Sequence, residues 1–203
     1  MSKEKKKLAQ KINQKIIKGF YTGSLLVSTP DILDPRFNKS VIYIISHNNK
    51  GAMGFIINKP IEDVNLSDIL KIKKPKNIVD SKKNHSVLFG GPVEFKSGFL
   101  LHSTDYEINN ITLKINDKFY LTNDTKAIED LYQGNGPSSS LFMLGYAGWY
   151  PGQLEKEILE DSWLVVNADP EFVFSTSYSN KYNLSLQMLG IENAFFSSGS
   201  GKA

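Results

Sequence analysis

The sequence contains no cysteine, which excludes disulfide bonds, thiolate metal ligands, iron–sulfur clusters and cysteine nucleophiles together. It also lacks any apolar run near the ~20 residues that span a bilayer. The N-terminus is rich in lysine but has neither the apolar core nor the cleavage site of a secretion signal. We therefore expect a cytoplasmic protein without a transmembrane segment.

Arginine is almost absent, because Arg36 is the only one among 203 residues. The net charge of +3 is unevenly distributed. Residues 1–18 carry seven lysines and one glutamate, a net charge of +6, whereas the rest of the chain has 17 basic and 20 acidic residues, a net charge of −3. Since arginine makes most bidentate contacts with guanine and phosphate, the body of the chain gives no electrostatic indication of nucleic-acid binding.

The length and the ordinary apolar and charged fractions fit a single globular domain. We place this domain at residues 19–203, behind a basic N-terminal extension at residues 1–18. In the extension Leu8, Ile12 and Ile16 recur every four residues among lysines, which predicts a short amphipathic helix. Packing of its apolar stripe on the domain is the preferred interpretation, and contact with nucleic acid or anionic lipid is the alternative.

Short strands and turns, irregularly interleaved with helices, follow the extension. Residues 41–46 and 53–58 predict a hairpin, in which Gly54 allows a bulge or a close backbone approach. The other predicted strands cover residues 24–28, 87–89, 98–102, 111–115, 119–122, 140–144, 163–166 and 172–174. Helices are predicted over residues 65–70, 125–132, 151–161 and 182–189, and a surface loop over 71–84. This order favours an α+β fold, a single domain with a mixed, barrel-like β-sheet flanked by helices.

The common catalytic and nucleotide-binding motifs do not occur. The C-terminal Gly199–Ala203 (GSGKA) fails as a phosphate-binding loop, because Phe196 occupies the first glycine position and Ala203 the hydroxyl position. No G-x-S-x-G, G-x-G-x-x-G or His-Glu-x-x-His pattern is present. The three histidines His47, His85 and His102 are widely separated, so we predict no metal site, no cofactor and no assigned catalytic residue.

The remaining candidates are polar and aromatic residues at strand ends, beside glycines. Histidine is included because its imidazole titrates near neutral pH, and paired glycines because they can present backbone N–H groups to an anion. Purely structural roles stay open for each of them. The candidate binding residues are His47, Asn58, Gly90, Gly91, His102, Tyr146 and Trp149.

Several blocks of the chain resemble the YqgE/AlgH family of bacterial proteins. They are DPRFNKSVIYIISHNNKGAMGFIINKP, LFGGPV, GFLLHS, LGYAGWYPGQLEKEI and the final GKA, and together they cover about residues 20–203. The resemblance implies an α+β domain with a mixed, barrel-like sheet flanked by helices. It implies no catalytic residue or cofactor, and the label of transcriptional regulation attached to the family defines no site. Residues 1–18 extend beyond the usual start, and Tyr182 stands where many members have tryptophan.

Three functions are compatible with these observations. The first is a non-enzymatic regulatory or binding protein for a small molecule or a protein partner. The second is a hydrolase-like enzyme that uses His47 or His102 as acid or base. The third is nucleic-acid association through the lysine-rich N-terminal segment.

Overall fold

The computed structural model describes residues 20–69 and 85–191. The predictions for residues 1–18, for the loop 71–84 and for Gly199–Ala203 lie outside these residues. The strands are β1 (Ser24–Ser28), β2 (Val41–Asn48), β3 (Gly51–Ile56), β4 (Pro60–Asn65), β5 (Ser86–Phe89), β6 (Val93–His102), β7 (Leu113–Lys114), β8 (Tyr120–Thr122), β9 (Ser140–Trp149) and β10 (Trp163–Asn167). The helices are η1 (Pro35–Phe37), α2 (Leu66–Ile69), α3 (Thr125–Gln133), α4 (Gln153–Leu159), α5 (Pro170–Ser175) and α6 (Tyr178–Met188).

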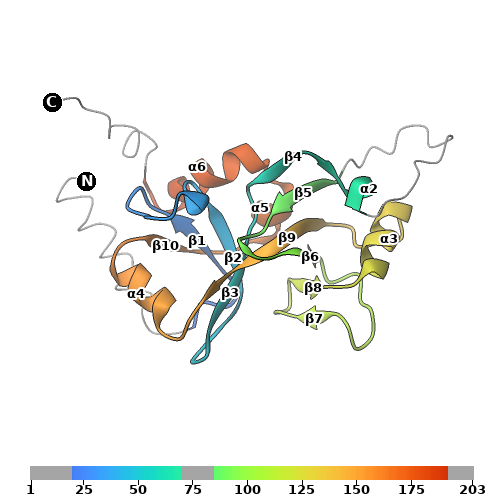
Figure 1. Ribbon diagram of the computed structural model, residues 1–203, viewed down its shortest axis with the longest axis horizontal. Helices are drawn as coiled ribbons and strands as arrows, with labels where there is room; N and C mark the ends of the chain where they lie inside the picture. Colours follow the sequence, from blue (N-terminus) through green and yellow to red (C-terminus); the bar gives the residue numbers. More distant parts are fainter. Residues whose placement is uncertain (1–19, 70–84, 192–203) are drawn as a thin grey trace.

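The strands form one curled, mixed sheet (Figure 1). The order β10-β1-β2-β3-β9-β6-β8-β7 is antiparallel throughout. The strand β5 pairs in parallel with β9 and antiparallel with β4. The prediction of an α+β fold with a mixed sheet is confirmed.

Helices cover both faces of the sheet, and side chains therefore alternate between two cores. Leu25 and Tyr43 point to the core beneath α5 and α6, whereas Leu26 and Ile42 point to the core beneath α4. The helix α3 covers β5, β6 and β9 at the other end (Figure 1). Burial on both faces explains the continuous apolar run of β2, which would alternate with polar residues in a half-exposed strand. Tyr182 of α6 lies in the first core and donates a hydrogen bond to the carbonyl of Ser28 at 3.0 Å.

The strand β9 changes partners halfway along. Its first half pairs with β5 and β6, whereas residues 147–149 pair with β3. Gly145, at φ +69°, lies between these halves. There the backbone of Gly90 and Gly91 crosses β9 so closely that a Cβ atom would lie 2.3 Å from the Gly145 carbonyl oxygen or 2.1 Å from the Tyr146 carbonyl carbon. Only glycine fits such a crossing.

The hairpin prediction is confirmed by β2 and β3, where a Cβ atom on Gly54 would lie 2.8 Å from the Tyr43 carbonyl oxygen. The helix predicted at 125–132 is confirmed as α3. The strand predicted at 172–174 is wrong, because this segment belongs to α5. The Asp169 side chain accepts a hydrogen bond from the Glu171 N–H, and Pro170 occupies the first turn. These are helix-start signals that outweigh the β propensity of the following aromatic residues.

Candidate functional site

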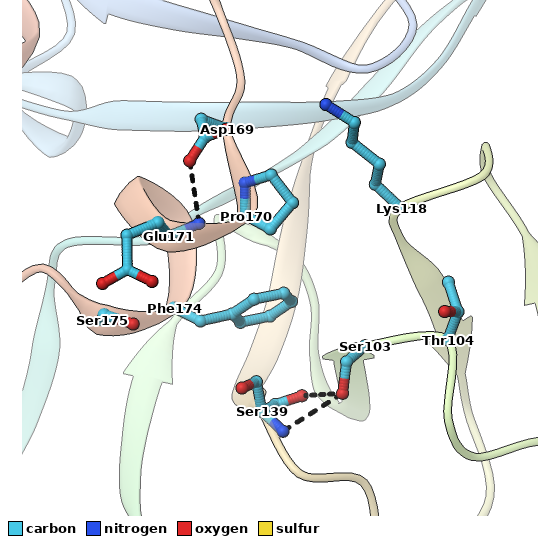
Figure 2. A pocket seen from close by; sticks show the side chains of 9 residues that line it. All are labelled: Ser103, Thr104, Lys118, Ser139, Asp169, Pro170, Glu171, Phe174 and Ser175. Carbon is cyan, nitrogen blue, oxygen red and sulfur yellow. Dashed lines mark hydrogen bonds between the residues drawn. The ribbon is translucent and has the colours of Figure 1, made fainter.

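A pocket of about 520 Å³ opens between α5 and the loops at one end of the sheet (Figure 2). Its volume lies within the range of about 300–1,000 Å³ that is usual for small-molecule sites. We call it the α5 pocket. Its lining residues come from the ends of β6 and β9, the β7–β8 turn and α5, and they are Ser103, Thr104, Lys118, Ser139, Asp169, Pro170, Glu171, Phe174 and Ser175.

The sheet side of the α5 pocket is held by a network around Ser103. The Ser103 hydroxyl donates to Asp105 Oδ1 at 2.5 Å and accepts from the Ser139 N–H at 3.1 Å. Asp105 Oδ2 accepts from the Ser138 N–H at 3.0 Å. The hydrogen bonds from Ser103 and Ser138 lower the pKa of the Asp105 carboxyl, since they stabilise its ionised form. This wall is therefore preorganised and anionic at its outer edge.

The opposite side of the α5 pocket is built by α5 and its cap. Asp169 caps the helix by accepting the Glu171 N–H at 3.0 Å. The half-buried ring of Phe174 projects between the two walls (Figure 2), and its centroid lies 5.4 Å from that of Phe119 in the core. The core contact fixes the aromatic ring that the pocket presents to a ligand.

His102 lies directly beneath the sheet-side wall and is fully buried. Its Nδ1 lies 2.8 Å from the Ser103 carbonyl oxygen, which can only accept, so Nδ1 carries the proton. Its Nε2 then accepts from the Thr122 hydroxyl at 2.9 Å. Burial lowers the pKa of His102, which favours this neutral tautomer. Both ring nitrogens are engaged, so His102 contacts the α5 pocket only through the backbone of Ser103.

His47 lies at the end of β2, and its side chain is 1% exposed. Its Nδ1 accepts from the Tyr21 N–H at 3.0 Å, which leaves the proton on Nε2. Nε2 donates to Glu155 Oε1 at 3.1 Å. The Tyr21 ring stacks on the imidazole with 5.2 Å between centroids. His47, near the end of β2, thus links the segment just before β1 to the helix α4.

The two histidines lie far apart, as their partners along β9 show. His102 pairs with Ser140, whereas His47 pairs with Ala52, which pairs with Trp149. Nine residue steps of β9 separate these positions, roughly 30 Å of extended chain, with the left-handed Gly145 between them. His47 and His102 therefore lie near opposite ends of β9.

The Asn58 amide is engaged by the loop that precedes β2. Its Oδ1 accepts from the Val41 N–H at 2.8 Å, and its Nδ2 donates to the Lys39 carbonyl at 2.9 Å. The adjacent Lys59 donates to the Arg36 carbonyl at 2.7 Å. The pKa of Lys59 is lowered by burial. This arrangement fixes the loop against the end of β3.

The aromatic and glycine candidates belong to the β9 crossing and to the start of α4. The Gly90 N–H donates to the Leu144 carbonyl at 2.8 Å, and Gly91 packs on Tyr146. The Trp149 indole N–H donates to Glu157 Oε2 at 2.8 Å. Tyr146 is half-buried, with its ring edge-on to that of Phe99 at 6.1 Å.

Among the seven candidates, His102 is the one that adjoins the α5 pocket. Sequence reasoning did not select the pocket residues themselves. Some of the pocket residues nevertheless carried a local sequence signal. Ser103 is the last residue of the GFLLHS block, and Asp169–Pro170 is a helix-start signal. Lys118 and Ser139 carried none, because only the folding of β7, β8 and β9 brings them to α5.

Within residues 20–69 and 85–191, no group of three or more His, Cys, Asp or Glu side chains is placed to hold a metal ion. Over the same residues, every helix is too short or too polar to cross a membrane.

Comparison with other proteins identifies relatives of this chain. A family model described as AlgH-like matches residues 25–194. A UPF0301 protein from Bradyrhizobium sp. is 43% identical over 191 residues, covering 91% of this chain and 88% of that protein. A UPF0301 protein from Ruegeria pomeroyi is 42% identical over 182 residues, covering 90% of this chain and 98% of that protein.

Two solved structures resemble this one. The solution structure of the AlgH protein from Pseudomonas aeruginosa matches with a TM-score of 0.72 and 31% identity, over 92% of this chain and 97% of that chain. A crystal structure of a protein from Corynebacterium diphtheriae matches with a TM-score of 0.62 and 22% identity, over 80% of this chain and 83% of that chain, and supports the fold alone. The resemblance inferred from the sequence blocks is confirmed, and this chain belongs to the AlgH-like family.

Proposed function

We propose that this protein is a non-catalytic ligand-binding protein and that the α5 pocket is its binding site. The observation that carries the proposal is the pocket itself, about 520 Å³ lined by hydroxyl groups, charged groups and one aromatic ring. A few polar groups converging beside an apolar surface are the usual composition of a small-molecule site. The hydrogen bonds of Ser103 and Ser139 support the proposal, because a preorganised wall lowers the entropic cost of binding.

The environment of the histidines favours binding over hydrolysis. A general base must come within about 3 Å of the proton that it removes. His102 is buried with both nitrogens engaged, and the Nε2 of His47 is held by Glu155. Ser103 in the pocket donates to Asp105, a carboxylate whose lowered pKa makes it a weak base. A regulatory role would follow if another protein recognised the ligand-bound form of this protein. Nucleic-acid association through residues 1–18 stays a separate prediction.

The test is a thermal-shift screen of nucleotides, phosphorylated metabolites, amino acids and short peptides, followed by a blocking variant. A ligand at about 100 times its Kd should stabilise the fold by about 2.7 kcal/mol, or raise Tm by roughly 5–10 °C for a chain of this size. Thr104→Trp should fill the pocket from its exposed rim and abolish the shift. Asn109→Trp, exposed in the same loop but outside the pocket, is the matched control.

Each result has a defined meaning. A shift that is lost in Thr104→Trp and retained in Asn109→Trp supports the proposed site. A shift retained in both variants places the ligand elsewhere and overturns the assignment of the pocket. A null result over the whole collection overturns small-molecule binding and leaves a protein partner as the better hypothesis.

A further inference from the structure

We propose that the ligand of the α5 pocket is a small zwitterion, with an amine and a carboxylate or phosphate in one molecule. This inference rests on the proposed binding function and goes beyond it. The charges that line the pocket come from two elements. Asp169 and Glu171 belong to the α5 wall, whereas Lys118 belongs to the β7–β8 turn, and its side chain extends away from Ser103 and Ser139 (Figure 2).

Lys118 is the cationic group that would receive the anionic end of the ligand. It is exposed, and in the part of the chain that the structure describes its ammonium forms no ion pair. By contrast, the ammonium groups of Lys114 and Lys126 pair with carboxylates at 3.0 and 2.8 Å. A carboxylate or phosphate beside Lys118 would gain one charge-assisted hydrogen bond from its ammonium. The Ser103 hydroxyl adds none, because it donates its proton to Asp105.

The α5 wall offers the complementary site for an amine. Asp169 uses Oδ1 as the helix cap, and over the described residues no hydrogen bond or ion pair engages its Oδ2 or the Glu171 carboxylate. The ring of Phe174 projects between the walls (Figure 2), and an aromatic face attracts a cation within about 6 Å of its centroid. Two carboxylates and an aromatic ring together favour an ammonium group.

The division of charge selects against ligands of a single sign. An anion would be attracted by Lys118 but repelled by Asp169 and Glu171, whereas a cation would be attracted by the two carboxylates but would leave Lys118 without a partner. A zwitterion pairs with the lysine and with the carboxylates at once. The volume of about 520 Å³ accommodates a molecule of amino-acid size with room for an aromatic substituent.

The experiment titrates the full-length protein with matched probes and follows backbone amide shifts by NMR. The zwitterions are L-phenylalanine and phosphoethanolamine, which distinguish a carboxylate from a phosphate source. The singly charged analogues are phenethylamine, 3-phenylpropionate, ethanolamine and inorganic phosphate. We expect at least one zwitterion to shift the amides of residues 103–104, 118, 169 and 171–175, with a Kd at least tenfold lower than that of either of its own analogues.

Two variants test the division of charge. Lys118→Met should raise the Kd of that zwitterion at least tenfold. The double variant Asp169→Asn with Glu171→Gln should also raise the Kd at least tenfold, because it removes both negative charges. The helix cap is kept, because asparagine is also a good N-cap residue. Lys50→Met and Glu129→Gln, exposed charges outside the pocket, should change the Kd less than twofold.

The possible failures are distinguishable. If a singly charged or neutral compound binds as tightly as the zwitterions, and Thr104→Trp abolishes its binding while Lys118→Met does not change it, the zwitterion proposal is overturned and the binding function stands. If neither zwitterion shifts the pocket amides, the zwitterion proposal is overturned. If no compound of the wider screen shifts those amides either, the binding function falls as well.

Discussion

The Nδ1–H of His102 donates its hydrogen bond to the carbonyl of Ser103, 2.8 Å away, and thereby links a fully buried imidazole to the wall of the α5 pocket. The chain of hydrogen bonds continues on the other side of the ring. Thr122 donates to His102 Nε2, the Thr112 and Thr122 hydroxyls lie 2.8 Å apart, and the Ile108 N–H donates to Thr112. Every donor in this series has one acceptor, so the loop between β6 and β8 is fixed to the residue that lines the pocket.

His102→Leu should therefore destabilise the protein by about 3 kcal/mol at pH 7.5, because the Thr122 hydroxyl and the Ser103 carbonyl lose their buried partner. Burial lowers the pKa of His102 below its ordinary value of 6.5, so just below pH 6.5 the unfolded chain binds more protons than the folded one. The stability that neutral His102 contributes is accordingly lost as the pH falls through this window. Urea unfolding of both proteins should show the difference narrowing from pH 7 to pH 5. A constant difference would contradict the lowered pKa of folded His102.

Glu157 is the polar centre of the α4 core. Its Oε2 accepts from the indole N–H groups of Trp149 and Trp163, both at 2.8 Å, and its Oε1 accepts from the Gln153 amide at 2.8 Å. Glu157→Ala should cost about 3 kcal/mol in the free energy of unfolding, since it removes the charged acceptor that two largely buried indoles share. Glu160→Ala, at an exposed position of the same helix turn, should cost less than about 0.5 kcal/mol. Equal losses in the two variants would show that the network contributes nothing specific.

The fold could be predicted further than the site, and Phe172–Phe174 show why. Local signals were sufficient for α3, which follows the cap residue Asp124 and ends at Gly134. At α5 the cap Asp169–Pro170 was equally visible, but the aromatic and β-branched residues favoured a strand. This misassignment removed from consideration the helix that forms one wall of the α5 pocket.

The pocket residues also come from segments distant in the sequence. Lys118 and Ser139 reach α5 only because β6 pairs with both β8 and β9, and no sequence spacing encodes that juxtaposition. By contrast, Asn58 and Trp149 were selected as polar or aromatic residues at strand ends, and Gly90 and Gly91 as a glycine pair that could bind an anion. In the structure these residues fix loops and strand crossings. Local sequence signals thus pointed to the demands of the fold more readily than to the cavity.

The crossing of β9 by the Gly90–Gly91 segment predicts different costs for glycine substitutions. Gly91→Ala would bring a Cβ atom to 2.1 Å from the Tyr146 carbonyl carbon, a backbone clash that requires the crossing to open. We expect a loss of more than about 3 kcal/mol or failure to fold. Gly134→Ala is the matched control, because its Cβ atom meets nothing within 4 Å although φ is +82°. It should lose about 1–2 kcal/mol from the left-handed conformation alone. Equal losses by chemical unfolding would show that the crossing is not tightly constrained.

Lys181 gives a second pH prediction, in a more alkaline range than that of His102. Its side chain is fully buried in α6, donates to the Thr176 carbonyl and lies 5.1 Å above the Tyr178 ring. Burial lowers the pKa of Lys181 to about 8, whereas an unfolded lysine has a pKa of about 10.4. Between these values the unfolded chain binds the extra proton, so folding becomes more favourable as the pH rises.

Lys181→Met removes this titration while it keeps an unbranched side chain in the core. We expect the variant to be more stable than the wild type at pH 7, because a buried cation is replaced by an apolar group. The difference should shrink as the pH is raised from 8 to 10, where the wild-type amine becomes neutral. Urea unfolding across this range measures it, with Lys50→Met as the exposed control that should leave the pH dependence unchanged. A difference independent of pH would mean that Lys181 keeps its proton in the folded state, held by the Thr176 carbonyl and the Tyr178 ring.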